Sequence, residues 1–234
     1  MFESVRLPHD LRKEDFQPLE ERLRESLLDA QFELAEQKRK CVLALINGSD
    51  GAGKGEVMQL GAAKNTATNE DGYLSVIRAK TAELFAAACE VGPALAAKQK
   101  AEQAACRSFG MNLGIAFQLI DDALDYGGKS AKLGKNVGDD FREGKITLPV
   151  VLSFRRGSES ERAFWNRTLA DGEVRDGDLD TAITLIAKHH AIEDTVGRAR
   201  HYGAIATDAL ALVPPSEIKT ALEETVAFCI ARAH

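Results

Sequence analysis

Residues 94–127 make one long stretch that contains no proline, is rich in alanine and repeats its apolar positions with a helical period. Such a stretch predicts a single long helix. No strand-like apolar run bounded by turn residues follows Glu56, so the rest of the chain reads as successive helices. We place these near residues 56–67, 72–91, 94–127, 147–156, 160–169, 178–190, 192–212 and 216–232.

Glycine and proline pairs punctuate this helical pattern. We expect breaks at Gly92-Pro93, Gly127-Gly128 and Pro214-Pro215, because these dipeptides mark turns and loops. Pro149 falls where a helix would begin, and its missing N–H costs nothing in a first turn. The sequence therefore predicts an all-α domain over residues 56–234.

The first 55 residues have a different pattern. An amphipathic helix is expected after Pro18, up to about Lys38, and the apolar run CVLALIN at 41–47 resembles a buried strand. The run leads into residues 48–55, GSDGAGKG, which fit the phosphate-cradling pattern G-x-x-x-x-G-K. We therefore expect residues 1–55 to form a separate helix, strand and P-loop-like segment.

Charge and cysteine content exclude several classes. The net charge of −6 argues against a nucleic-acid-binding protein, and no run approaches the roughly 18 apolar residues of a membrane span. The first 16 residues are too charged for a signal peptide. The cysteines show neither C-x-x-C nor zinc-ligand spacing, so we expect reduced thiols in a cytoplasmic protein; they are Cys41, Cys89, Cys106 and Cys229.

A cluster of oxygen ligands ends the long helix. Gln118, Asp121, Asp122 and Asp125 follow the spacing i, i+3, i+4, i+7, which places them on or near one helical face. Carboxylates one turn apart repel one another, and the helix dipole disfavours negative charge at this end. Two penalties at one place indicate that function selected these residues, and hard oxygen ligands suit Mg²⁺.

The alternative is a solvated acidic face, since a bare D-D-x-x-D carries little weight. The residues that follow favour a site. Lys132, Lys135 and Lys145 surround a second acidic pair, Asp139-Asp140, in a segment punctuated by glycine. Carboxylates for a metal and lysines for phosphate oxygens form the combination expected of a site for diphosphate and Mg²⁺.

These residues carry a resemblance to a known family. AFQLIDDALDY followed by LGKNVGDDFREGKITLPVVL resembles the second aspartate-rich region of trans-polyprenyl diphosphate synthases of the octaprenyl or decaprenyl type. The resemblance extends from about Gly55 to His234. It implies an all-α isoprenoid-synthase fold and a role in isoprenoid (quinone side-chain) biosynthesis, in which an allylic diphosphate condenses with isopentenyl diphosphate using Mg²⁺.

The resemblance also implies roles for particular residues. Asp121, Asp122 and Asp125 would hold Mg²⁺ against the diphosphate, and Lys80 would contact the allylic diphosphate. Thr81 and Gln118 would lie near the developing carbocation. The remaining residues would support the metal waters and the phosphate; they are Lys135, Asp140 and Lys145.

Family members carry a second aspartate-rich motif on a facing helix, and this sequence contains one D-D-x-x-D. We therefore expect the 234-residue chain to bind Mg²⁺ and diphosphate without making a polyprenyl product, as a truncated chimera joined near Gly55-Glu56. The family's homodimers imply a homo-oligomer.

A second resemblance leads to an alternative function. Residues from about 10 to 56 resemble the start of polyphosphate:AMP phosphotransferases, whose P-loop also has glycine in place of Ser or Thr. Gly53 and Lys54 would then bind phosphate, and the chain would be a phosphotransferase that acts through Lys54. Because a P-loop is normally backed by a complete parallel sheet, we expect this loop to be a vestige. A third reading is a helical remnant without activity.

Overall fold

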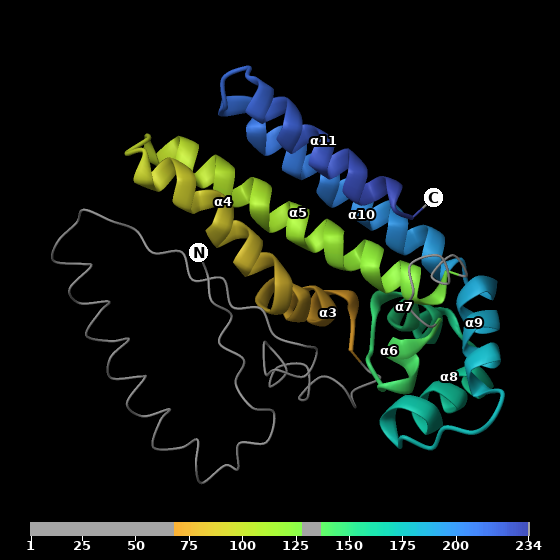
Figure 1. Ribbon diagram of the computed structural model, residues 1–234. Helices are drawn as coiled ribbons and strands as arrows, with labels where there is room; N and C mark the ends of the chain where they lie inside the picture. The colour runs from red at the N-terminus through yellow and green to blue at the C-terminus, as the bar shows by residue number, and fades with distance from the viewer. Residues whose placement is uncertain (1–67, 128–136, 234) are drawn as a thin grey trace, which may run out of the picture. The chain divides into compact units, whose positions relative to one another are not determined.

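Helix α5 (Lys100–Tyr126) is the element around which the other helices pack (Figure 1). The computed structural model describes residues 68–127 and 137–233. A capping box between Gln99 and Glu102 starts α5, and the chain leaves the helix at Gly127. Helix α4 (Glu83–Leu95) lies along one side of α5 and α10 (Ala191–Ala209) along another.

The remaining elements complete an all-helical arrangement. Residues 68–127 and 137–233 contain no strand, so the all-α prediction is confirmed for this part of the chain. The predicted strand at 41–47, the P-loop and the helix at 56–67 lie outside the described residues. The other elements are α3 (Glu70–Ile77), η1 (Arg78–Ala82), α6 (Asp139–Arg142), α7 (Leu148–Arg156), α8 (Glu159–Trp165), η3 (Asn166–Ala170), α9 (Asp178–Lys188), η4 (Leu210–Leu212) and α11 (Glu217–Ala231).

One predicted break is wrong. Helix α4 continues through Gly92-Pro93 to Leu95, and α5 begins at Lys100 rather than at residue 94. Proline removes only its own N–H donor, and the carbonyl of Pro93 still accepts a hydrogen bond of 2.9 Å from the N–H of Lys98. The chain turns at Ala97, whose φ of 49° is the left-handed conformation that closes many helix ends.

The other two breaks agree with the structure. Helix α5 stops at Tyr126, one residue before Gly127, and the prolines at 214 and 215 separate η4 from α11. Pro149 lies in the first turn of α7, as its missing N–H predicts.

Glycine allows α4 and α5 to approach closely. A Cβ on Gly110 would lie 2.7 Å from the carbonyl carbon of Phe85 and 2.9 Å from the Cα of Ala86. One turn further along α5, a Cβ on Gly114 would lie 2.7 Å from the Cα of Ala82. Because these neighbours are backbone atoms, the close approach of α5 to α4 and to the end of η1 depends on the absence of side chains at these two positions.

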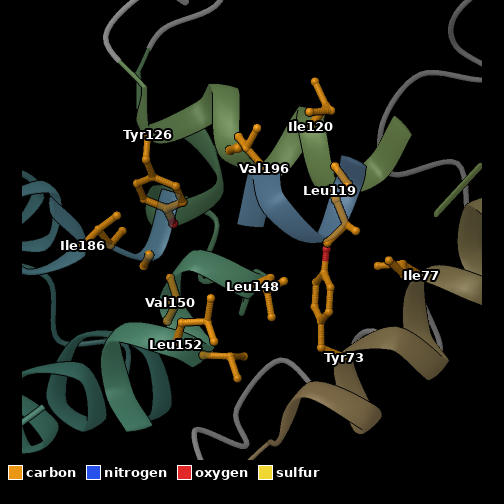
Figure 2. Close-up of a cluster of buried hydrophobic side chains, with 14 of the residues drawn as sticks. Tyr73, Ile77, Leu119, Ile120, Tyr126, Leu148, Val150, Leu152, Ile186 and Val196 are labelled. Carbon is orange, nitrogen blue, oxygen red and sulfur yellow. The ribbon is translucent and has the colours of Figure 1, made fainter. Parts of the chain in front are cut away.

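The larger hydrophobic core lies around the aspartate-bearing end of α5. It joins residues of α3, α5, α7, α9 and α10 (Figure 2). It also includes the fully buried Trp165 of α8. A smaller cluster near the other end of α5 contains Phe109, Leu210 and Val226. No helix among the described residues is long and apolar enough to cross a membrane.

A charged contact fixes α3 against α10. The guanidinium of Arg198 donates from both Nε and Nη2 to the carboxylate of Glu70, with Nη2 at 2.9 Å from Oε2. Both side chains are about 30% exposed (31% and 27%), and bidentate geometry of this kind is more specific than a single ion pair. The bond holds the start of α3 in place, and α3 supplies Tyr73 to the core (Figure 2).

Candidate functional site

A chain of hydrogen bonds joins α3, η1 and α5. Thr81 Oγ1 donates to Gln118 Oε1 at 2.9 Å, and Gln118 Nε2 donates to Asp122 Oδ1 at 2.8 Å. From α3, the Tyr73 hydroxyl donates to Asp122 Oδ2 at 2.5 Å. The family resemblance implies that Thr81 and Gln118 both lie near the developing carbocation, and the structure joins them by a hydrogen bond.

The π-helical turn η1 presents Lys80 and Thr81. Residues 78–82 form a π-helical turn that lies between α3 and α4 in the chain, and such turns occur frequently at functional sites. Lys80 is half-buried on this turn, next to Thr81 in the chain. The turn therefore carries two predicted site residues to the α5 side of the fold.

Burial changes the ionisation of Asp122. The residue is 3% exposed, and removal from water raises the pKa of its carboxyl to about 7. The hydrogen bonds from Tyr73 and Gln118 oppose this rise in pKa, and the negative charges of Asp140 and Asp121 add to it. A carboxylate this deep is held by its two donors rather than by water.

Asp121 lies on a different side of α5 from Asp122. Its carboxylate is 34% exposed, and its Oδ1 lies 3.9 Å from Nη2 of Arg232, near the end of the chain. The Arg232 guanidinium also lies over the ring of Phe117, 5.1 Å from its centroid. Asp121 is thus the more accessible carboxylate of the neighbouring pair.

Asp125 faces the short helix α6. Its Oδ2 accepts a 3.1 Å hydrogen bond from the backbone N–H of Asp140, and its backbone carbonyl accepts one of 2.9 Å from the N–H of Gly138. Gly138 has a φ of 80°, a conformation that glycine adopts without strain. Burial and the Asp140 carboxylate together raise the pKa of Asp125 to about 6.

Lys145 supplies a positive charge to Asp140. Its Nζ lies 3.1 Å from Asp140 Oδ1 and 2.6 Å from Glu143 Oε2. Burial alone would lower the pKa of Lys145, but the bonds and charges of Glu143 and Asp140 outweigh burial and raise it. Asp125, Asp140 and Lys145 therefore form one connected group at the end of α5.

Not every predicted site residue can be placed. Gly53, Lys54, Lys132 and Lys135 lie outside the described residues. Across residues 68–127 and 137–233, no three His, Cys, Asp or Glu side chains are grouped as they would be around a metal ion. Asp121 and Asp125 share a face of α5 at i, i+4, whereas Asp122 is turned toward α3.

Two residues at the site were not predicted from the sequence. Tyr73 lies in a stretch used to establish the resemblance, yet its partner Asp122 is 49 positions away, so no local pattern connects them. The contact of Arg232 with Asp121 is equally hidden, because Arg232 lies near the other end of the chain and no local pattern connects the two residues. A tyrosine on the apolar face of a helix was the only available signal, since a buried phenol normally finds a hydrogen-bond partner.

Comparison with known proteins gives a consistent result. Residues 26–186 match the family model described as polyprenyl synthetase, a match that includes the glycine loop at 48–55. An octaprenyl diphosphate synthase of Haemophilus influenzae is 37% identical over 169 residues, which cover 72% of this chain and 51% of that protein. The chain spans about half the length of the curated relatives it matches.

Solved structures agree with the family match. A decaprenyl diphosphate synthase from Rhodobacter capsulatus superposes with a TM-score of 0.73 at 47% identity, over 77% of this chain and 55% of that one. A polyprenyl synthase from Caulobacter crescentus, complexed with calcium and isoprenyl diphosphate, gives 0.72 at 45% identity, with the same coverage of 77% and 55%. The predicted isoprenoid-synthase fold is confirmed.

Proposed function

The chain belongs to the polyprenyl synthetase family, and on that premise we propose that it binds an allylic diphosphate together with Mg²⁺ at the carboxyl end of α5. The observation that carries the proposal is the arrangement there: Asp121 and Asp125 on one face of α5, with Asp140 and Lys145 beside them. The reaction class of the family is prenyl transfer: diphosphate leaves the allylic substrate, isopentenyl diphosphate attacks the resulting cation, and a proton is lost to give the longer prenyl diphosphate.

The residues present suit a hard divalent cation. Mg²⁺ is commonly held by one or two carboxylates while waters and substrate phosphates complete its octahedron, so a full cage of protein ligands is not required. The raised pKa of Asp125, with Asp140 as a cause after burial, indicates acidic groups placed close together. Asp121 and Asp125 would hold the ion, which would supply charge neutralisation for the departing diphosphate.

In this proposal the lysines and the polar uncharged residues have different roles. Lys80 and Lys145 offer positive charge to phosphate oxygens, and the family resemblance implies the same role for Lys135. Thr81 and Gln118 present oxygen atoms rather than cations, and such weakly basic dipoles stabilise a developing positive charge without trapping it. Asp140 holds Lys145 in place through the 3.1 Å contact.

Binding can be tested on the chain as it is. Isothermal titration of farnesyl diphosphate with Mg²⁺ should show binding, and Asp121→Ala should weaken it at least tenfold. Asp208→Ala is the matched control, because Asp208 is an exposed aspartate on α10. Equal effects of the two substitutions, or no binding by the unsubstituted chain, would contradict the proposal.

Turnover is a separate question. Ionisation of an allylic diphosphate requires metal ions held in a fixed geometry, and a missing electrostatic element alone costs about a hundredfold or more in rate. Since the sequence contains one D-D-x-x-D, we propose that this polypeptide binds substrate but makes no polyprenyl product. Radiolabelled isopentenyl diphosphate with farnesyl diphosphate, followed by thin-layer chromatography, tests this. Asp121-dependent growth of prenyl chains would refute it.

Association of chains is also proposed. Leu84 and Leu95 are 68% and 62% exposed on α4, and their spacing of three helical turns places them on one face. Exposed apolar residues aligned in this way favour self-association. Light scattering at tens of micromolar should show species larger than a monomer, and a monodisperse monomer would argue against it.

The phosphotransferase alternative draws no support from the described residues, since Gly53 and Lys54 lie outside them.

A further inference from the structure

Asp122 is the most buried of the three aspartates of its motif, although Asp125 is also buried, at 9% exposed. Both carboxylate oxygens of Asp122 already accept a short hydrogen bond, Oδ2 from Tyr73 at 2.5 Å and Oδ1 from Gln118 at 2.8 Å. With 3% of its surface exposed, it is poorly placed to meet Mg²⁺, which dehydrates reluctantly and keeps several waters. Neighbouring residues on a helix point about 100° apart, so Asp121 and Asp122 lie at opposite edges of the face that the motif shares.

The contact with Asp122 fixes the direction of the Gln118 amide. Both oxygens of Asp122 accept hydrogen bonds, and the NH₂ end of the amide is the end that donates to Oδ1. The carbonyl end, Oε1, is then directed to Thr81 Oγ1, which donates to it at 2.9 Å. A reversed amide would set oxygen against carboxylate oxygen and would leave the Thr81 hydroxyl without this acceptor. The orientation of two substrate-facing groups in the proposed function therefore follows from Asp122.

Tyr73 holds Asp122 in this position. Its ring is 4% exposed within the larger core, and Figure 2 shows it standing between α3 and α5. Helix α3 is itself fixed to α10 by the contact of Glu70 with Arg198. The hydroxyl of Tyr73 thus comes from a rigid element rather than from a loop, which is the arrangement that keeps a partner's geometry constant.

We propose that Tyr73 and Asp122 are a positioning pair: they set the amide of Gln118, and through it the hydroxyl of Thr81, while Mg²⁺ is left to Asp121 and Asp125. This inference rests on the proposed function of the site. It corrects the expectation from the sequence pattern that all three aspartates of the motif ligate the metal.

Metal affinity separates the two roles. Mg²⁺ is titrated into the full chain in the presence of farnesyl diphosphate, with Asp121→Asn, Asp122→Asn and Asp125→Asn compared. These substitutions change volume little, so each variant should fold. We expect Asp121→Asn and Asp125→Asn each to weaken Mg²⁺ binding tenfold or more, and Asp122→Asn to change it less than threefold. A loss in Asp122→Asn as large as that in Asp121→Asn would overturn the assignment.

The side-chain amide signal of Gln118 gives a readout that does not depend on substrate. In protein labelled with ¹⁵N-glutamine, this signal is identified by its disappearance in Gln118→Leu. We expect its position to change in Tyr73→Phe and in Asp122→Leu. Tyr126→Phe is the control, because Tyr126 is 2% exposed in the same core and its hydroxyl has no hydrogen-bond partner among the described residues.

The Mg²⁺ titration and the Gln118 amide signal test different parts of the proposal. An unchanged Gln118 signal in both Tyr73→Phe and Asp122→Leu would refute the positioning pair even if the metal results agreed. An equal change in Tyr126→Phe would also refute it, since the effect would then belong to the core in general. Failure of the unsubstituted chain to bind Mg²⁺ with diphosphate would instead refute the proposed function, and the amide signal would still decide whether Tyr73 and Asp122 orient Gln118.

Discussion

The close approach of α4 and α5 makes Gly110 the position where one methyl group should do the most damage. In Gly110→Ala the new Cβ would lie 2.7 Å from the carbonyl carbon of Phe85 and 2.9 Å from the Cα of Ala86. Carbon atoms pack at about 3.5–4.0 Å, so the two helices must separate by roughly 0.7 Å or more. Overpacking of this kind costs about 1–3 kcal/mol, and alanine returns up to about 1 kcal/mol of helix propensity.

Gly197→Ala is the matched control for this prediction. Gly197 also lies within a helix, α10, but a Cβ there would meet nothing within 4 Å. This variant should gain about 0.5–1 kcal/mol, whereas Gly110→Ala should lose about 1–2 kcal/mol. Urea denaturation followed by circular dichroism measures both free energies of unfolding. If Gly110→Ala were as stable as Gly197→Ala, the account of the α4–α5 seam would be wrong.

Three further predictions concern stability. In metal-free buffer, the free energy of unfolding should fall by a few kcal/mol between pH 5 and pH 8. The pKa of Asp122 is about 7 in the folded chain and about 3.9 in the unfolded chain, so the stabilisation by its neutral form is lost as pH rises through the folded value. Urea titrations should show a flatter pH profile for Asp122→Asn. Arg198→Met should cost about 1–2 kcal/mol by the same assay, since it leaves the half-buried Glu70 without its bidentate partner. Ala97→Gly should raise the thermal midpoint by relieving roughly 1 kcal/mol of strain at a φ of 49°, and a lower midpoint would show that the residue is unstrained.

Most helices could be predicted because their signals are local. The apolar period of α5 and the proline in the first turn of α7 are readable over a few residues. The error at Gly92-Pro93 has a physical cause. A proline near the end of a helix loses one donor, while its carbonyl still serves the residues that close the helix, as the bond from Lys98 to Pro93 shows.

Candidate residues for the site could be named from the sequence, but their long-range contacts could not. Helical spacing predicted that Gln118, Asp121, Asp122 and Asp125 lie on or near one face. The family resemblance implied that Thr81 and Gln118 lie near the same carbocation, and the structure shows a hydrogen bond of 2.9 Å between them. The partners of Asp122 and Asp121 could not be foreseen, because Tyr73 and Arg232 reach them across 49 and 111 positions of sequence. Contacts of that range depend on how helices pack, which no local pattern specifies.

The burial of Asp122 lowers the stability of the fold, while its position serves the proposed function of the site. A carboxyl whose pKa is raised to about 7 by burial is an expensive residue for a core, and an apolar side chain of similar size would normally be preferred there. Tyr73 and Gln118 satisfy its oxygens, which limits the cost but does not remove it. The residue makes sense if a hydrogen-bond acceptor is needed to hold the Gln118 amide in one direction, because an apolar side chain would leave the amide free to turn. Stability is thus given up at a core position where the orientation of a neighbour is required.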